Sequence, residues 1–265
     1  MSKSKFLLPL LVVAFFSCGK ESNKPNPAPV NNLTGKLAKV DLGVGIYDSL
    51  FYGQDGKLNK ISTYYESGGT VTYKENYFFS YNNNGKPASV QIENADEYRY
   101  TYINGIVAAV SRYENGVKTN YKIYNYTADN LLESVELYEK PLQGGVGFAY
   151  TERIDYTYYP GGNLKTETQY QIDPLGQAIK LVTTIYEDYD QRTNVDTAFR
   201  NFLYMTGIST MKNNARKVTR RNETTGAEQV YYYQFDYASN NSPSKRIMRR
   251  TPGGAPETEI VYSYY

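Results

Sequence analysis

The sequence contains no histidine, no tryptophan and a single cysteine among its 265 residues. Without histidine, every Ser-His, Cys-His and His-metal arrangement is excluded as a catalytic or metal site. One cysteine cannot form a disulfide within the chain, so the fold must depend on packing and hydrogen bonds. Carboxylate chemistry remains open in principle, but no pair of acidic residues stands out. We therefore expect no enzyme, no cofactor and no metal.

The first residues combine positive charge with a short apolar run. Lys3 and Lys5 precede residues 6–16, which are apolar throughout and contain Pro9. A run of about 11 residues extends only about 17 Å as a helix, whereas a membrane-crossing helix needs roughly 20 residues. This pattern is typical of a signal peptide that directs export and is then removed. We predict that residues 1–17 are this signal peptide.

The cysteine directly follows the apolar run. The segment Phe15-Phe16-Ser17-Cys18-Gly19 resembles the lipobox of bacterial lipoproteins, with phenylalanine where leucine is usual. The resemblance implies cleavage before Cys18 and attachment of diacylglycerol to its thiol. The alternative is an ordinary secreted protein with an incidental cysteine. We expect a lipid-anchored protein of the cell envelope, at the outer membrane, and the sequence leaves its periplasmic or surface face open.

Residues 18–32 differ in composition from the rest of the chain. Lys, Asn, Pro and Ser predominate, and Pro25, Pro27 and Pro29 favour an extended, polyproline-like geometry. At roughly 3.1 Å per residue, about 14 such residues reach about 40 Å. We predict that the lipidated cysteine and this segment form a tether, and that residues 33–265 form one domain.

A tyrosine-rich motif repeats along this domain. Residues 51–58 and 80–87 align without a gap, and each consists of an aromatic residue, turn residues, glycine, lysine and the start of an apolar stretch. Looser copies occupy residues 100–106, 124–131 and 156–164, with degenerate copies at Tyr189 and Tyr237. The spacing between copies varies, which indicates a hairpin of variable length.

Turn dipeptides separate alternating stretches. The dipeptides that favour positive φ in tight hairpins are Asp55-Gly56, Gly68-Gly69, Asn84-Gly85, Asn104-Gly105, Asn115-Gly116 and Gly161-Gly162. Between them polar and aromatic residues alternate, as in residues 98–102, and a period of two predicts strands. Tyrosine suits such a sheet because its ring packs across strands while its hydroxyl stays hydrated. The sequence therefore predicts an all-β domain of stacked antiparallel hairpins.

Residues 196–207 break this pattern. Their apolar residues fall at helical spacing, at Ala198, Phe199, Phe202 and Leu203. Asp196 is suited to the N-cap and Gly207 to the C-terminal stop. We expect one short helix here, packed over the sheet.

The repeated pattern of Tyr-x-Tyr, turn, Gly-Lys-Leu and a strand ending in tyrosine resembles the YD repeats of Rhs proteins. It also resembles small repeat-bearing bacterial lipoproteins of unknown function. The resemblance covers roughly residues 46–190, where Tyr47-Asp48 and Tyr189-Asp190 retain the Tyr-Asp dipeptide. In large relatives such repeats curl into a shell around a cargo. Because this chain is too short to enclose anything, the implied form is an open twisted or half-closed sheet.

Three function classes remain. The leading one is a membrane-anchored, non-enzymatic binding or scaffold lipoprotein with a protein or glycan partner and no nucleic-acid partner. Glycan binding is its sharper form, because sugars stack on aromatic rings, although tryptophan, the residue most often used for this, is absent and cross-strand packing is the better explanation of any given tyrosine. The second is a carboxylate-dependent polysaccharide hydrolase. The third is a membrane-spanning β-barrel, which is disfavoured because faces opposite the tyrosines carry Lys, Glu, Arg and Thr.

Several short patterns suggest surface sites. Residues 187–190 with Asn194 and Asp196 form the densest acidic stretch, but Arg192 stands where a calcium loop needs Asp or Asn, which favours a solvated strand end. Ser49 and Thr197 lie in patterns that resemble bacterial O-glycosylation acceptors. The formal net charge of +2 equals the two signal-peptide lysines, so the mature chain is neutral. The C-terminal quarter is mildly basic, with clusters at 216–221 and 245–250. Solvated surface is the favoured interpretation, and contact with lipid headgroups or an anionic glycan is the alternative.

Overall fold

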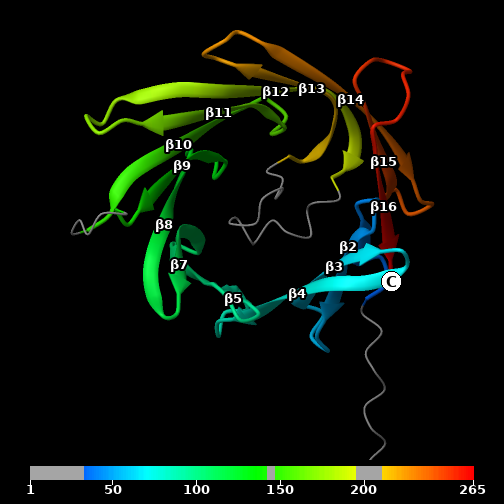
Figure 1. The fold of residues 1–265 in the computed structure, drawn as a ribbon, viewed down its shortest axis with the longest axis horizontal. Coiled ribbons are helices and arrows are strands. Elements are labelled where there is room, and N and C mark those ends of the chain that lie inside the picture. The colour runs from blue at the N-terminus through cyan, green and yellow to red at the C-terminus, as the bar shows by residue number, and fades with distance from the viewer. Residues whose placement is uncertain (1–32, 142–146, 195–210) are drawn as a thin grey trace, which may run out of the picture. The chain divides into compact units, whose positions relative to one another are not determined.

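The computed structural model describes residues 33–141, 147–194 and 211–265. These residues form sixteen antiparallel strands in a closed barrel (Figure 1), with each strand beside its neighbours in sequence and β1 beside β16. The strands are β1 (Leu37–Asp41), β2 (Ile46–Tyr52), β3 (Leu58–Ser67), β4 (Thr70–Tyr81), β5 (Pro87–Ile92), β6 (Glu97–Ile103), β7 (Ile106–Glu114), β8 (Val117–Tyr126), β9 (Leu132–Glu139), β10 (Ala149–Tyr158), β11 (Leu164–Ile172), β12 (Ala178–Thr193), β13 (Asn213–Asn222), β14 (Glu228–Tyr237), β15 (Pro243–Arg249) and β16 (Thr258–Tyr264).

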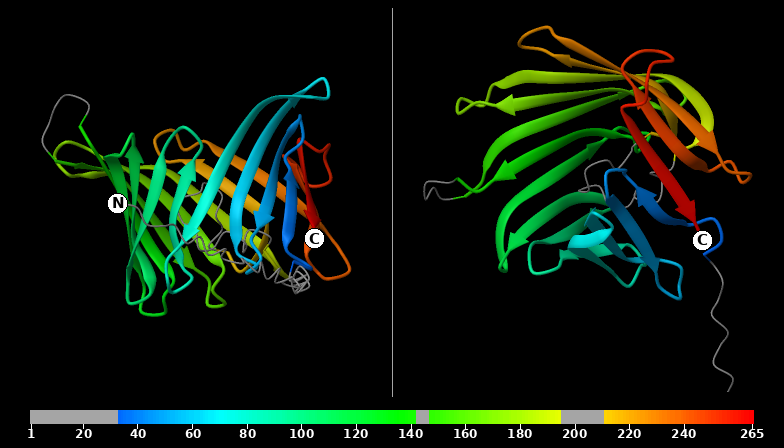
Figure 2. Two further views of the ribbon diagram at one scale, coloured as in Figure 1. Left: turned by 90° about the horizontal axis from the view of Figure 1, so that it is seen from below. Right: turned by 45° about the vertical axis from the view of Figure 1, so that its right-hand side comes forward.

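The expectation of an open or half-closed sheet is wrong. Val40 of β1 lies opposite Tyr262 of β16, and this pairing joins the first and last strands (Figure 2). Closure pairs the two edges of the sheet and depends on strand number and tilt, not on a cargo to be enclosed. Chain length was therefore the wrong criterion. The described residues contain no helix, and the helix predicted over residues 196–207 lies outside them.

Each copy of the sequence repeat corresponds to a pair of strands. The aligned tyrosines lie at or near the ends of even-numbered strands, as Tyr52 does in β2 and Tyr81 in β4. The shortest turns have positive φ at both central residues, with values of 50° and 82° at Asn104 and Gly105. That geometry matches the right-handed twist of the flanking strands. The hairpin prediction is confirmed.

The longer turns share one hydrogen-bond pattern. The Gly53 amide donates to the Lys57 carbonyl at 2.8 Å, and the Gly56 amide donates to the Gly53 carbonyl at 2.9 Å. The same two bonds recur in the turns at 82–86, 127–131, 159–163 and 238–242. The fourth residue takes a positive φ, 73° at Gly56 and 72° at Gly85. This is the reason for glycine at that position of the motif.

A tyrosine hydroxyl bridges each of several strand pairs at this end of the barrel. Tyr81, the last residue of β4, donates to the carbonyl of Leu58, the first residue of β3, at 2.6 Å. We call this bond the tyrosine clasp. Further clasps join Tyr52 to Leu37, Tyr102 to Pro87, Tyr158 to Leu132, Tyr189 to Leu164 and Tyr264 to Pro243. Burial raises the pKa of Tyr81 to about 12, so the hydroxyl stays a neutral donor.

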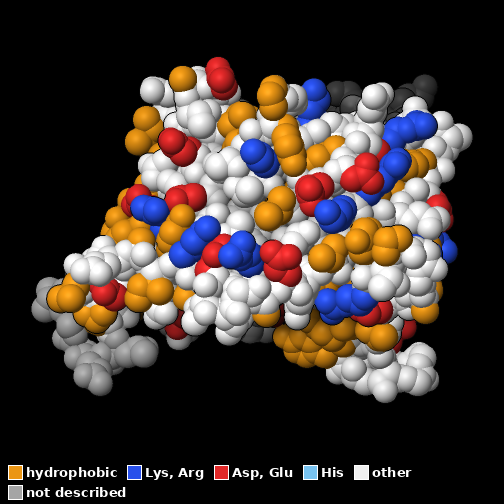
Figure 3. Space-filling model, turned by 90° about the horizontal axis from the view of Figure 1, so that it is seen from above, with side chains coloured by type: hydrophobic (Ala, Val, Ile, Leu, Met, Phe, Trp, Pro, Cys, Tyr) orange, Lys and Arg blue, Asp and Glu red, His pale blue; other side chains and the backbone are white. Residues whose placement is uncertain are grey.

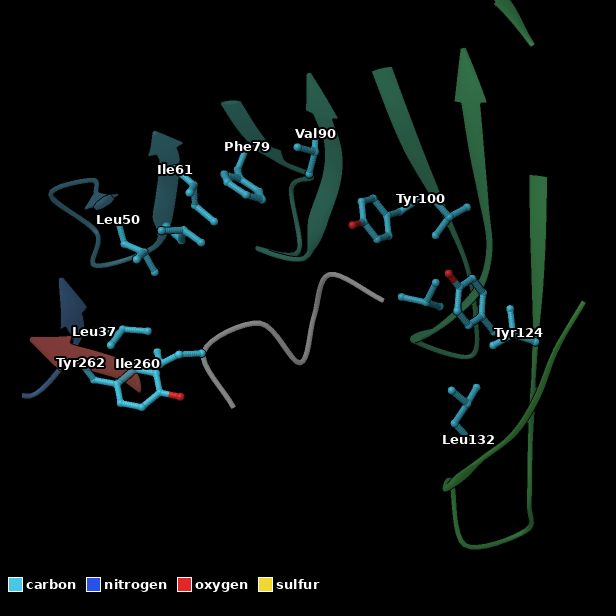
Figure 4. Packing of buried hydrophobic residues seen from close by; sticks show 14 residues of the cluster. Leu37, Leu50, Ile61, Phe79, Val90, Tyr100, Tyr124, Leu132, Ile260 and Tyr262 are labelled. Atoms are coloured by element: carbon cyan, nitrogen blue, oxygen red, sulfur yellow. The ribbon is translucent and has the colours of Figure 1, made fainter. Parts of the chain in front are cut away.

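Buried apolar side chains lie on the inner face of the wall. Leu50 is opposite Ile61, and Phe79 is opposite Val90, so the strand register places them on one face. Figure 4 shows them on the interior side, with Tyr100 of the neighbouring strand β6 next to Val90. Leu50 and Val90 are fully buried. These side chains belong to a continuous hydrophobic cluster on the inner face.

The outer face is polar, even where its residues are buried. Ser62 lies there, opposite Ser49, and its hydroxyl donates to the Asn76 side chain at 2.6 Å. Lys217 and Glu187 form an outer ion pair of 2.9 Å between β13 and β12. Figure 3 shows Lys, Arg, Asp and Glu side chains interspersed over the face in view. Strand alternation therefore puts the aliphatic cluster inside, together with polar residues such as Asp48 and Thr63, and leaves a mainly polar and aromatic outer face.

Aromatic rings on the outer face pack across strands. Tyr121 and Tyr138 stack with ring centroids 4.8 Å apart, and Tyr150 continues the stack at 5.1 Å from Tyr138. The Lys39 ammonium lies 4.1 Å from the centroid of the Tyr47 ring. Such pairs stabilise a sheet beyond the area they bury. Cross-strand packing thus accounts for these tyrosines.

The first prediction concerns the turn glycine. Replacing Gly85 by valine should destabilise the barrel by about 1 to 3 kcal/mol, because a β-branched residue is strained at positive φ. A new Cβ would also meet the Lys57 ammonium at 3.3 Å, but that side chain can move away. The measurement is a denaturant melt of Gly85→Val against wild type.

The matched control for this melt is Gly161→Val. Gly161 is not in the positive-φ region, and nothing in the structure lies within 4 Å of a Cβ built on it. Glu97→Gln on the outer face loses only a surface ion pair with Arg99, at 2.6 Å, and should stay within about 0.5 kcal/mol. Lys118→Gln is a poorer control, because its ammonium lies 4.0 Å from the Tyr121 ring centroid. Equal midpoints for Gly85→Val and wild type would refute the turn assignment.

A second prediction concerns the clasp. Tyr81→Phe keeps the ring and leaves the Leu58 carbonyl without its donor, so it should cost about 1 to 3 kcal/mol. Tyr64→Phe is the control, because the Tyr64 hydroxyl has no hydrogen-bond partner in the part of the chain that the structure describes, while its ring stacks on Tyr47. Thermal unfolding of both variants separates the contribution of the hydroxyl group to stability from that of the aromatic ring. Equal losses would mean that the clasp contributes nothing.

Candidate ligand-binding pocket

A cavity of about 170 Å³ lies against strands β12 to β15. Asn194 and Met211 also border it. The side chains that decide its chemistry are Tyr186, Asn214, Val218, Tyr233, Phe235 and Arg246. Its lining thus combines aromatic rings, a carboxamide and a guanidinium group.

The strand register brings these side chains together on the inner face. Tyr186 of β12 lies opposite Val218 of β13, and Phe235 of β14 lies opposite Arg246 of β15. Tyr233 is two residues before Phe235, so alternation places both rings on one face. The pocket is therefore assembled from four consecutive strands of the wall.

A buried polar cluster forms one side of the pocket. The Asp190 carboxylate accepts hydrogen bonds from the Asn214 backbone amide at 3.2 Å, the Asn214 side-chain amide at 3.3 Å and the Tyr237 hydroxyl. Asn214 is 1% exposed and Asp190 is 9% exposed. Burial, followed by the bond to Asp190, raises the pKa of Tyr237. The hydroxyl therefore stays protonated and fixes the carboxylate.

The side-chain oxygen of Asn214 is the unusual member of this cluster. The amide nitrogen donates to Asp190 and to backbone carbonyls at 3.4 Å. The Oδ1 atom is buried and has no hydrogen-bond partner among the described residues. A buried acceptor without a donor costs about 1 to 3 kcal/mol, so such atoms call for an explanation.

Arg246 supplies the charge of the pocket. It is the one ionisable cation among the described residues that line the cavity, and its guanidinium carbon lies 5.6 Å from the Tyr233 ring centroid. Burial raises the pKa of Tyr233, and the positive charge of Arg246 partly offsets this. The neighbouring Lys245 instead pairs with Glu259 at 2.8 Å on the outer face. Among the described residues, Arg246 has no carboxylate within ion-pair distance.

The described members of the acidic stretch are dispersed, and Asp196 lies outside the described residues. Glu187 pairs with Lys217 outside, Asp188 has a positive φ of 54°, and Asp190 is buried against Asn214, not at a solvated strand end. Over residues 33–141, 147–194 and 211–265, no group of three or more His, Cys, Asp or Glu side chains is placed to hold a metal ion.

The structure describes one of the two residues predicted as O-glycosylation sites. Ser49 is half-buried on the outer face of β2, between Lys39 and Ser62 in register. Thr197 lies outside the described residues, as does Cys18.

Sequence reasoning missed the pocket. The sequence groups Arg246 with the basic cluster at 245–250, for which solvated surface is the favoured prediction and contact with lipid headgroups or an anionic glycan the alternative. The alternation of Tyr233, Gln234 and Phe235 was the available signal for the inner face. The residues of β15 that lie opposite Tyr233 and Phe235 depend on a register shift between Asp236 and Tyr237. The sequence does not reveal this shift.

Comparisons with known proteins locate the fold but no family. No family model matches the chain, and no curated protein matches its sequence. A porin-like protein from Bacteroides uniformis resembles the structure with a TM-score of 0.57 at 12% identity, over 88% of this chain and 99% of the other. This similarity confirms the barrel fold and, at that identity, nothing more.

Two further structures are more distant. A porin-like protein from Bacteroides vulgatus has a TM-score of 0.46 at 12% identity, over 87% of this chain and 98% of that one. The TcdB2-TccC3 complex has a TM-score of 0.33 at 17% identity, over 84% of this chain and 14% of that one. Within the described ranges, no helix has the length and apolarity to cross a membrane.

The third prediction tests the Asp190 cluster. Tyr237→Phe should cost about 1.5 to 3 kcal/mol at pH 7, the range for a hydrogen bond to a charged group. The folded pKa of Tyr237 is raised above its ordinary value of 10.0, so the unfolded chain ionises first as the pH rises. The stability from this tyrosine is therefore complete below pH 10 and declines above it.

Urea melts of wild type and Tyr237→Phe between pH 7 and pH 11 measure this effect. The difference between the two midpoints should shrink above pH 10. Tyr232→Phe on the outer face is the control and should show no such change. A constant difference would mean that the Tyr237 hydroxyl is not coupled to Asp190.

Proposed function

We propose that this chain is a non-enzymatic binding lipoprotein of the cell envelope. In this proposal Cys18 carries the lipid, residues 18–32 form the tether, and the barrel stands in water and binds its ligand on the inner face. We further propose that the repeats are degenerate relatives of YD repeats. The correspondence of each repeat to one pair of strands supports this. The observation that carries the proposal is the polarity of the outer face.

A lipid-facing wall needs an apolar band about 25 Å tall, with charged substitutions costing about 2 to 4 kcal/mol at its centre. Here the outer face carries Ser62, Asn76, Thr183 and Lys217 within the strands. Arg153 and Asp155 form an outer ion pair of 3.0 Å in β10. Water, rather than lipid, is the solvent that suits this face.

The names of the two Bacteroides structures suggest a second candidate, a membrane pore. A porin has apolar residues outside and polar residues inside. In this chain Leu50, Ile61 and Val90 are buried on the inner face, so these aliphatic residues do not lie on the lipid-facing side, where a porin needs them. The pore is therefore the weaker proposal.

The glycan-binding form of the proposal remains, while the hydrolase form loses support. Glycoside cleavage requires two carboxyl groups that face the sugar. No carboxylate of the described residues lines the cavity, and Asp190 is held by Asn214 and Tyr237. Binding, rather than cleavage, suits this lining.

The fourth prediction tests the anchor. Cys18→Ser removes the thiol that accepts lipid, so the variant should incorporate no labelled fatty acid and should leave the membrane fraction. Ser22→Ala, a change of similar size in the tether, should behave as wild type. Cell fractionation and fatty-acid labelling make the comparison. Equal labelling and retention of Cys18→Ser would end the lipoprotein proposal.

A further inference from the structure

Three tyrosine rings form a continuous stack on the outer face of strands β8, β9 and β10. Tyr138 is in the middle, and the strand register places it opposite Tyr121 of β8 and Tyr150 of β10. Its ring plane is inclined by 1° to that of Tyr121, with 4.8 Å between the ring centroids, and by 22° to that of Tyr150, with 5.1 Å between the centroids. All three residues are half-buried, so part of each ring is open to solvent.

The hydroxyl group of Tyr138 has a proton acceptor. It donates to the Glu136 carboxylate at 3.0 Å, and the Asn125 side-chain amide lies 3.5 Å from the other oxygen of this carboxylate. Burial, followed by the bond to Glu136, raises the pKa of Tyr138 to about 12, so the side chain is a neutral phenol at physiological pH. A phenol that loses an electron becomes a strong acid, and a carboxylate already hydrogen-bonded to it is placed to take the proton.

The charges around the rings single out Tyr138. A cation over an aromatic ring opposes removal of an electron, because the oxidised ring is itself positive until its proton leaves. Lys118 lies 4.0 Å from the Tyr121 ring centroid, whereas no lysine or arginine of the described residues lies over the Tyr138 ring. The stacked pair of β2 and β3 differs in this respect, since Lys39 lies 4.1 Å from the ring centroid of Tyr47.

We propose that Tyr138 is an oxidation site, where a haem peroxidase supplied with hydrogen peroxide joins it to Tyr121 or Tyr150 as dityrosine. Each of the two phenols gives one electron to the oxidant and one proton to a base, which is Glu136 for Tyr138. The two radicals form a carbon–carbon bond between ring positions next to the hydroxyl groups, and the hydrogens of those carbons then move to the oxygens. The two electrons and two protons that leave convert one hydrogen peroxide molecule into two water molecules.

The product links neighbouring strands covalently. Directly opposite residues of antiparallel strands have Cβ atoms about 5 Å apart, so the rings can join without a change in register. Disulfides supply such links in many exported proteins, but the one cysteine of this chain cannot form a disulfide within it. The site is independent of the proposed ligand binding, because the stack is on the outer face and the pocket is on the inner face.

Oxidation of the purified full-length chain in detergent, with a haem peroxidase and limiting hydrogen peroxide, tests the site. The fluorescence of dityrosine measures the yield, and tandem mass spectrometry of the digested protein locates the link. We expect one predominant product within a single chain, in which Tyr138 is joined to Tyr121 or to Tyr150. The position of the link identifies the partner.

Three variants separate the groups of the site. Tyr138→Phe keeps the ring and should abolish this product, whereas Tyr232→Phe on the outer face of β14 is the matched control and should leave it unchanged. Glu136→Gln keeps a hydrogen-bond acceptor but removes the base. The product should then form at least about tenfold more slowly, since a positioned base typically contributes more than this, and added buffer base should restore part of the rate. Circular dichroism checks that each variant folds.

Three results overturn the proposal. The first is that dityrosine does not form within the chain, the second that the predominant link joins Tyr47 to Tyr64, and the third that folded Glu136→Gln reacts at the wild-type rate. If Tyr138→Phe does not fold, the position of the link in wild type and the rate of Glu136→Gln decide.

Discussion

The rest of the structure depends on the ladder between β1 and β16. It joins Val40 to Tyr262 and Asp41 to Val261, residues from opposite ends of the domain. Once this ladder forms, both sheet edges are paired, and the wall has a defined inside and outside. The inner hydrophobic cluster runs across this ladder, since Leu37 of β1 and Ile260 and Tyr262 of β16 belong to it. Closure is thus the constraint from which the two faces follow.

The two faces of the wall carry different sets of side chains. Leu50 and Val90 are buried within, while Ser62 and Asn76 hydrogen-bond to each other outside. The tyrosines serve both faces, since outer rings stack across strands and inner hydroxyls form the clasps. One residue type therefore packs the outer face and fixes the ends of the strand pairs. This dual use explains a sequence with 30 tyrosines and no tryptophan.

The pocket differs from the outer face in the partners of its charged and polar residues. Lys217 and Lys245 pair with Glu187 and Glu259 on the outer face, but Arg246 lies inside among aromatic rings. Asp190, Asn214 and Tyr237 come from β12, β13 and β14, and no two of them are close in sequence. Adjacent strands and their register create this cluster. A local pattern of residues cannot specify it.

The sequence by itself determined the strands, their turns and the correspondence of each repeat to a pair of strands. Asn104-Gly105 and the glycine of each longer turn act through φ angles, and residues 98–102 alternate with a period of two, so both signals are local. Only the tertiary structure decided that the sheet closes, that the polar face lies outside, and that Arg246 meets Tyr233 and Asn214. Those outcomes depend on register and on pairing between distant residues, because the same alternating strands can also form an open sheet.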